Sequence, residues 1–163
     1  MYEESIKLLQ RAAQDELAAI HQYMYFHFHL DDQGLTKLAA MFKQTAIGEM
    51  MHMERIAERI LFLKGDLDMT AAFPTEQIQE PVDMLKAAVK AETDAIKMYN
   101  DFAKQCGEHS DSNTKKLFED LVTDEETHYD QFDTELERID KYGIAYLALQ
   151  SDGMGDGGAG GGA

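Results

Sequence analysis

The chain has 163 residues, with 31 acidic against 15 basic side chains, a formal net charge of −16 at pH 7 and 44% hydrophobic residues. This length is sufficient for one domain with a hydrophobic core, and the excess of carboxylates opposes binding to nucleic acids. The single cysteine, Cys106, excludes an internal disulfide and a Cys-x-x-Cys metal knuckle. The acidic N-terminus and the lack of a long apolar run predict neither a signal peptide nor a membrane span, so we expect a cytoplasmic protein.

Periodic apolar residues, interrupted by glycine, proline and polar turns, predict helices along most of the chain. Four long helices and a short fifth one are expected at about 4–31, 35–64, 82–107, 112–142 and 144–150. β-branched residues are scarce and no segment alternates with a period of two, which indicates an all-α protein. Residues 1–150 are the predicted domain, and the Gly-rich residues 151–163 are a predicted flexible tail.

The connection between the second and third helices is long enough to run the full length of a bundle. A helix of about 28 residues is about 42 Å long, and the roughly 15 residues from Asp66 to Glu80 reach about 50 Å when extended. The other connections are short turns, which favour antiparallel hairpins. The expected fold is therefore a four-helix bundle with one long crossover, the topology of ferritin-like folds, plus the short C-terminal helix.

Each long helix carries a glutamate inside its apolar stripe, where a charge is aimed at the core. The second and fourth of these glutamates begin Glu-x-x-His motifs, and residues three apart share one helix face. The residues are Glu16, Glu49 with His52, Glu92, and Glu125 with His128. Several uncompensated buried charges would each cost several kcal/mol, so a bound counter-charge is expected.

The same pattern occurs twice along the chain. Glu16 and Glu49 are 33 residues apart, as are Glu92 and Glu125, and the two halves are offset by 76 residues. The segments ELAAIHQY and ETDAIKMY share Ala, Ile and Tyr at equivalent places, which indicates a duplicated helical hairpin. The shared tyrosines are Tyr23 and Tyr99. They are candidates for hydrogen bonding to ligands or for supplying an electron, and equally for ordinary core tyrosines.

One Glu from each of two helices and Glu-x-x-His from each of the other two is the ligand set of di-iron and di-manganese carboxylate bundles. We predict a pair of iron ions, whose charge neutralises the four carboxylates. The predicted bridging ligands are Glu49 and Glu125, which bind both metals. Glu16 and Glu92 bind one metal each, and His52 and His128 complete the two sites. Bridging holds the metals about 3.5–4 Å apart, so that one oxidant takes an electron from both, which is ferroxidase chemistry.

At these residues the chain resembles the bacterioferritins. ELAAIHQY, GEMMHMERIAERILFLKG and DEETHYDQFDTELERI are similar to that family's helix signatures, and with KYGIAYLALQ as the short fifth helix the likeness covers about residues 1–150. The resemblance implies a homo-oligomeric shell of 24 subunits that oxidises Fe²⁺ with O₂ or H₂O₂ and stores ferric mineral. It also implies haem shared by two subunits, which aids iron release, and a ferredoxin-like electron donor.

The haem ligand of the resembled family corresponds to Met50, directly after Glu49. One residue turns about 100° around a helix, so Met50 points away from the metal face. Composition alone also allows ordinary interface packing by this methionine. Some bacterioferritins carry a His and an Asp upstream of this Glu as an iron site facing the cavity; Gln44 and Gly48 stand there, and the resemblance gives no support for that site. The family often has a Trp after the final His, and this chain has none.

Four alternatives use parts of the same pattern. A non-storing di-iron oxidase or peroxide reductase of the rubrerythrin type would use these ligands, but it would normally append a Cys-rich iron domain. A non-catalytic haem-binding shell protein is opposed by the retention of all six ligands. A ribonucleotide reductase radical subunit would need a longer chain, and a DNA-protecting mini-ferritin places its ligands between subunits.

Overall fold

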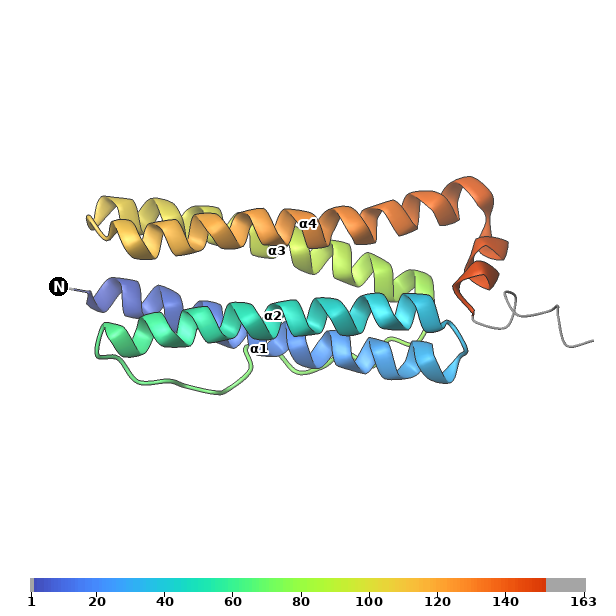
Figure 1. The fold of residues 1–163 in the computed structure, drawn as a ribbon, viewed down its shortest axis with the longest axis horizontal. Helices are drawn as coiled ribbons and strands as arrows, with labels where there is room; N and C mark the ends of the chain where they lie inside the picture. The colour runs from blue at the N-terminus through green and yellow to red at the C-terminus, as the bar shows by residue number, and fades with distance from the viewer. Residues whose placement is uncertain (1, 152–163) are drawn as a thin grey trace, which may run out of the picture.

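The computed structural model describes residues 2–151, which form four long α-helices and one short 3₁₀ helix. In chain order they are α1 (Glu3–Asp32), α2 (Thr36–Phe62), α3 (Pro81–Glu108), α4 (Ser112–Tyr142) and η1 (Ile144–Gln150). Helix α1 packs mainly on α2, and α3 packs mainly on α4. Figure 1 shows these two antiparallel hairpins side by side, with η1 at the end opposite the N-terminus. The predicted all-α bundle is confirmed, and its predicted tail, apart from Ser151, lies outside the described residues.

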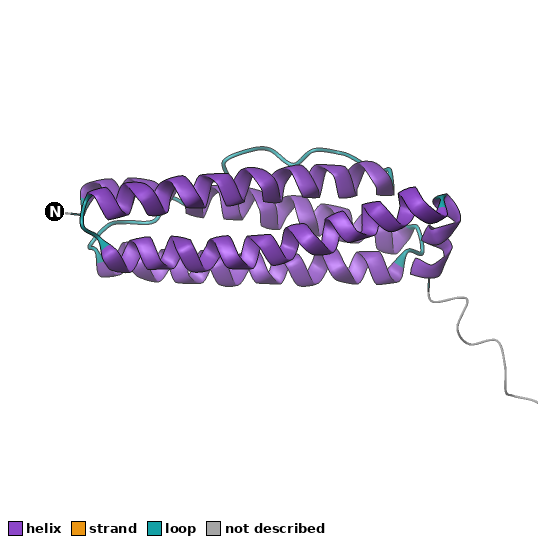
Figure 2. Ribbon diagram, turned by 90° about the horizontal axis from the view of Figure 1, so that it is seen from above, coloured by secondary structure: helices purple, strands orange, loops and turns teal. Residues whose placement is uncertain are grey.

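The link between α2 and α3 runs along the bundle, as its length predicts (Figure 1, Figure 2). It covers residues 63–80 and is fastened to α1 by glutamine side chains. Gln10 donates to the carbonyl of Asp68 at 2.8 Å and accepts from its N–H at 2.9 Å. Gln22 does the same with Glu76, at 3.0 and 2.7 Å. Each side-chain amide thus satisfies both backbone groups of one residue, which holds an extended segment in place without a sheet.

The helices begin and end within two residues of the predicted bounds, at residues that favour turns or helix starts. Gly34 and Gly143 adopt φ angles of 79° and 80°, in the left-handed region that favours glycine. Pro81 is the first residue of α3, where a missing N–H has no consequence. The carboxylate of Asp111 caps α4 by accepting from the N–H of Thr114 at 3.1 Å. None of the helices within residues 2–151 is both long and apolar enough to cross a membrane.

The short fifth helix is present at its predicted position but is a 3₁₀ helix, a form that is common in short pieces. The buried carboxylate of Glu135 on α4 anchors it. This carboxylate accepts from the Tyr146 hydroxyl at 2.9 Å and from Nε2 of Gln150 at 3.3 Å. Arg138 donates to its other oxygen at 2.9 Å. Because one buried carboxylate collects three donors, η1 is held against the end of α4.

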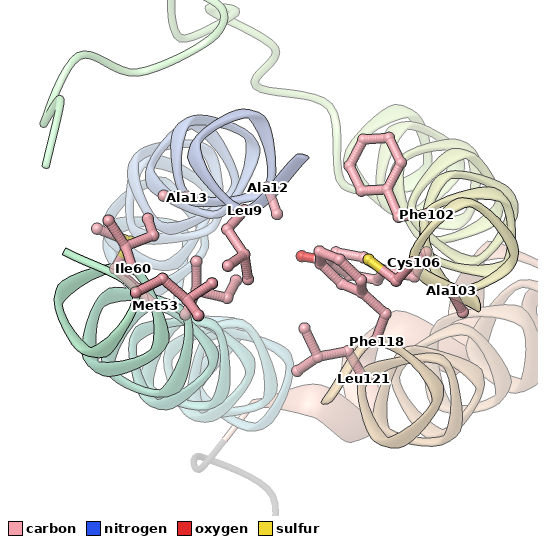
Figure 3. Close-up of a cluster of buried hydrophobic side chains, with 13 residues drawn as sticks. Leu9, Ala12, Ala13, Met53, Ile60, Phe102, Ala103, Cys106, Phe118 and Leu121 are labelled. Atoms are coloured by element: carbon pink, nitrogen blue, oxygen red, sulfur yellow. The ribbon is translucent and has the colours of Figure 1, made fainter. Parts of the chain in front are cut away.

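Two apolar clusters fill the bundle, one on each side of a layer of buried polar side chains. Figure 3 shows the first cluster, to which all four helices contribute, among them Leu9, Met53, Phe118 and the buried Cys106. The second cluster contains stacked aromatic rings and includes Tyr23, Phe26, Phe42 and Phe132. The polar layer between the clusters is therefore shielded from water along the bundle axis.

Candidate metal centre

The four stripe glutamates and two histidines lie together in this polar layer. Their ligand atoms form two overlapping groups, each within 4.8 Å of one another. One group is Glu16, Glu49, His52 and Glu125; the other is Glu49, Glu92, Glu125 and His128. Glu49 and Glu125 belong to both groups. All of these side chains are buried except that of His128, which is 14% exposed. The structure thus brings all six predicted residues together, with Glu49 and Glu125 common to both groups, and their roles as metal ligands stay a prediction.

Three carboxylate oxygens surround one ring nitrogen of His52. Nδ1 lies 2.8 Å from Glu125 Oε1, 2.9 Å from Glu49 Oε2 and 3.3 Å from Glu16 Oε1. A ring nitrogen carries at most one proton and cannot donate to all three oxygens. Ligands at about 2.1 Å from an octahedral metal lie about 3.0 Å apart, close to this spacing. The four atoms are therefore spaced as ligands of one cation.

The second group is related but wider. Nδ1 of His128 lies 3.2 Å from Glu49 Oε1, 3.7 Å from Glu125 Oε2 and 3.9 Å from Glu92 Oε2. The imidazole rings of His52 and His128 are stacked, with centroids 5.6 Å apart. The duplicated sequence thus produces two facing halves of one site.

Several buried polar atoms in this layer have no hydrogen-bond partner among the described residues. They include Glu49 Oε2, His52 Nδ1, Glu92 Oε2 and Glu125 Oε1. An unpaired buried polar group costs about 1–3 kcal/mol, and native proteins contain few of them. Within residues 2–151 no Lys or Arg forms an ion pair with the four glutamates. Hard oxygen ligands with two imidazoles fit a pair of divalent transition-metal ions, and iron suits this set.

The two tyrosines of the repeat form hydrogen bonds from one hairpin to the other. The hydroxyl of Tyr23 on α1 donates to Glu92 on α3, and that of Tyr99 on α3 donates to Glu16 on α1. Both rings are buried, so each hydroxyl has a partner inside the core. These reciprocal bonds fix the orientation of the two unshared carboxylates. An electron-donating role for the tyrosines stays a prediction.

Burial and mutual repulsion place protons on the site when no cation is bound. Burial, reinforced by the charge of neighbouring carboxylates, raises the pKa of Glu16 and of Glu92 well above the ordinary range. Burial alone would lower the pKa of His52, but the surrounding carboxylates raise it to about 12. The same balance raises the pKa of His128 to about 10. The pKa of Glu125 is lowered despite its burial, because the neighbouring Glu92 carboxyl and the two histidine rings stabilise its charged form.

A cavity of about 600 Å³ leads from the surface to the glutamates between α1 and α3. The crossover contributes Phe73 and Glu76 to its wall, and Asp15 and Asp94 line it from the two helices. Burial raises the pKa of Asp15. Arg11 and Lys90 also line the cavity, so its wall carries charges of both signs, and the buried glutamates lie at its inner end.

Comparison with known proteins agrees with this site. Residues 6–142 match the family model of the ferritin-like domain. Bacterioferritin from Rhodobacter capsulatus is 37% identical over 145 residues, covering 88% of this chain and 89% of the relative. Bacterioferritin from Desulfovibrio desulfuricans is 39% identical over 150 residues, covering 88% and 80%. The chain belongs to the bacterioferritin family.

Solved bacterioferritin structures share the fold over nearly the whole chain. The R. capsulatus structure, described as having a metal-free dinuclear site and a haem iron in a crystallographic special position, has a TM-score of 0.89 at 33% identity and covers 94% of this chain and 97% of that one. The D. desulfuricans structure, described as showing the diiron site in different catalytic states, has a TM-score of 0.89 at 34% identity, with coverage of 98% and 94%. The predicted ferritin-like bundle with a short C-terminal helix is thereby confirmed.

Met50, the predicted haem ligand of this bacterioferritin chain, lies on α2 away from the glutamates. Its side chain is 47% exposed, and its neighbours Ile47 and Met51 are 44% and 57% exposed. These residues form an apolar surface on the outside of the bundle. The predicted outward orientation is correct, whereas haem ligation stays a prediction.

Two residues beside the histidines were missed as functional candidates from the sequence. Asp124 Oδ2 lies 3.2 Å from Nε2 of His52, on the side of the ring away from the glutamates. Gly48 packs against His128, where an added Cβ would lie 3.2 Å from Nε2. The signal was present, because each residue directly precedes the glutamate of a Glu-x-x-His motif. His27, further along α1, has its Nδ1 2.8 Å from the carbonyl of Ala39 and takes no part in the site.

Proposed function

We propose that this bacterioferritin stores iron, after oxidising Fe²⁺ at the buried centre between the two hairpins. The observation that carries the proposal is the convergence of four carboxylates and two imidazoles, with unpaired ligand atoms, in a layer where no Lys or Arg of residues 2–151 pairs with the glutamates. Two iron ions held by shared carboxylates give up two electrons to one oxidant, O₂ or H₂O₂. Fe²⁺ is thus both the occupant of the site and the substrate.

The residues of the chain have separable roles in this proposal. Glu49 and Glu125 hold both ions, whereas Glu16 and Glu92 each hold one and are oriented by the tyrosine hydroxyls from the opposite hairpin. His52 completes one position and His128 the other. The apolar clusters on both sides exclude water, which strengthens the electrostatic interactions between ligands and ions. The cavity under the crossover reaches the buried glutamates and is the proposed route by which Fe²⁺ enters.

The relatives support the proposal. The D. desulfuricans bacterioferritin has a diiron site in several catalytic states, and the R. capsulatus bacterioferritin has a dinuclear site. Both share the bundle with this chain at a TM-score of 0.89. The ferritin-like fold and the bacterioferritin relatives support iron storage in particular. We expect a closed shell of 24 subunits, and the native mass of the particle distinguishes it from a non-storing di-iron enzyme.

We also infer that Met50 is an axial ligand of a haem shared by two chains. In the R. capsulatus bacterioferritin the haem iron occupies a special position, and an atom in such a position lies on a crystallographic symmetry element. A twofold axis beside the exposed Met50 would supply a second, identical thioether. Two thioethers are soft, neutral ligands that favour ferrous haem, which suits a haem that passes electrons inward to release stored Fe³⁺. A ferredoxin-like protein fits as the donor.

The test of the ferroxidase proposal compares two adjacent glutamates. Glu125 is buried in the site, whereas Glu126 is exposed on the surface of the same helix. Glu125→Ala should abolish the fast phase of Fe²⁺ oxidation, followed by absorbance in a stopped-flow instrument, while Glu126→Ala should leave it unchanged. Particle mass by light scattering checks that both variants assemble. Equal oxidation rates in the two variants would disprove the assignment of the site.

A further inference from the structure

The two halves of the duplicated site differ in the residue before each Glu-x-x-His motif. Asp124 stands before Glu125, and Gly48 stands before Glu49. In the folded bundle each of these positions faces the histidine of the other hairpin, Asp124 facing His52 and Gly48 facing His128. The pseudosymmetry of the repeat therefore provides a carboxylate for one histidine and none for the other.

Asp124 is well placed to fix His52. Its Oδ2 lies 3.2 Å from Nε2, so a proton on Nε2 is donated to the carboxylate and the Nδ1 lone pair faces the glutamates. Arg55 holds this carboxylate in turn, with Nη1 3.3 Å from the same oxygen. A metal-binding histidine whose outer N–H is held by a carboxylate is a stronger and better oriented ligand.

His128 has a different environment. Within the described residues its Nε2 makes no hydrogen bond. Gly48 faces this nitrogen without a side chain, and a Cβ at position 48 would lie 3.2 Å from it. The ring is 14% exposed, against 5% for His52. Its Nδ1 lies 3.2–3.9 Å from the surrounding carboxylate oxygens, whereas Nδ1 of His52 lies 2.8–3.3 Å from its own. His128 is therefore both less constrained and further from its co-ligands.

We propose that the two metal positions bind with unequal affinity, and that Asp124 is the positioning residue that makes the His52 position the tighter one. The His128 position, opposite Gly48, is the weaker and more readily exchanged. This inference rests on the proposed metal pair and adds an order of filling to it. One ion is then retained while the other is exchanged with the iron that passes through the site.

The test is an anaerobic titration of the intact particle with Co²⁺, a redox-stable stand-in for Fe²⁺, followed by its visible absorption. We expect two binding phases whose dissociation constants differ at least about tenfold, the lower end of the effect of an outer carboxylate on metal affinity. Crystals prepared with one Co²⁺ per chain should show the anomalous peak beside His52.

Variants identify the cause of the difference. Asp124→Ala should lower the affinity for the first Co²⁺ about 10–100-fold and leave the affinity for the second nearly unchanged. Asp120→Ala is the matched control, because Asp120 also pairs with Arg55 but does not contact His52. Asp124 is 47% exposed, so its removal should not unfold the bundle. Gly48→Asp should raise the affinity for the second Co²⁺. Gly48→Ala adds the same Cβ without a carboxylate and should leave that affinity unchanged.

The outcomes separate this inference from the proposal beneath it. Two Co²⁺ ions that bind with equal affinity, or a first ion that occupies the His128 side, would overturn the unequal positions. An Asp124→Ala variant that weakens both phases equally, or neither, would show that Asp124 does not act through His52. If no Co²⁺ binds inside the bundle, the proposed metal centre itself is wrong.

Discussion

Filling the centre with metal should release a number of protons that follows from the site. The pKa values of His52 and His128, about 12 and about 10, make both rings imidazolium at pH 7. Each ring must lose a proton before a nitrogen binds a metal, which gives two protons per metal pair. Glu16 and Glu92, whose pKa values burial raises, add up to two more. We therefore expect between two and four protons for every two divalent ions.

The displacement of protons by the metal also determines how metal affinity depends on pH. Because the pKa values of both histidines are raised in the folded protein, their protons compete with the metal at every pH below about 10. Each displaced proton raises the product of the two association constants about tenfold per pH unit. Because at least two protons are displaced, the product of the two association constants should rise at least about 100-fold between pH 6 and pH 7.

Anaerobic calorimetry in buffers of different ionisation enthalpy measures this release directly. The metal-free particle is titrated with Fe²⁺ or Co²⁺, and the slope of the heat against buffer enthalpy gives the number of protons. The Glu126→Ala variant is the control and should release as many as the unmodified protein. Release of fewer than two protons per pair, with binding intact, would show that the histidines are not held as imidazolium among the carboxylates.

Three further predictions concern other parts of the molecule. Met50→Leu should remove the haem absorbance and slow reductive iron release, with Fe²⁺ oxidation nearly unchanged, as measured by spectrophotometry. Ending the chain after Lys141 removes η1, two of whose side chains, Ile144 and Leu149, are 75% and 56% exposed; light scattering should then show a weakened or dispersed shell. Arg59→Ala leaves the buried Asp111 carboxylate without its cation at 2.8 Å, so the free energy of unfolding should fall by about 3 kcal/mol in denaturant titrations.

Matched variants and contrary outcomes accompany each of these. Met51→Leu changes a neighbouring exposed methionine and should keep the haem; a Met50→Leu particle with full haem and an unchanged spectrum would place the ligand elsewhere. An intact particle from the shortened chain would refute the role of η1. Lys90→Ala removes an exposed pair with Asp94 and should leave the free energy of unfolding nearly unchanged. Equal losses for Arg59→Ala and Lys90→Ala would contradict the importance of the buried pair.

Features that depend on spacing within one helix could be predicted from the sequence. The 33-residue repeat and the three-residue step from Glu49 to His52 depend only on helical periodicity, and the structure places these side chains in one layer. The crossover could be predicted because its length suffices to span the bundle. The position of η1 was also correct, although its 3₁₀ geometry has no distinct pattern in seven residues.

Contacts between the hairpins could not be predicted in the same way. The bond from Tyr23 to Glu92 and the contact of Asp124 with His52 depend on how the two hairpins are rotated and shifted against each other. Periodicity within a helix carries no information on that rotation. Gly48 illustrates the point: in the sequence it is only the residue before a Glu-x-x-His motif, whereas in the fold it is the close neighbour of His128.

The central claim is that the duplicated hairpins hold two metal ions in one buried layer. Crystals loaded anaerobically with Fe²⁺ and measured at the iron absorption edge test it most directly. We predict two anomalous peaks about 3.5–4 Å apart, with Glu49 and Glu125 contacting both and one histidine beside each. A bundle core without anomalous signal, in crystals whose iron is bound only at the surface, would contradict the account.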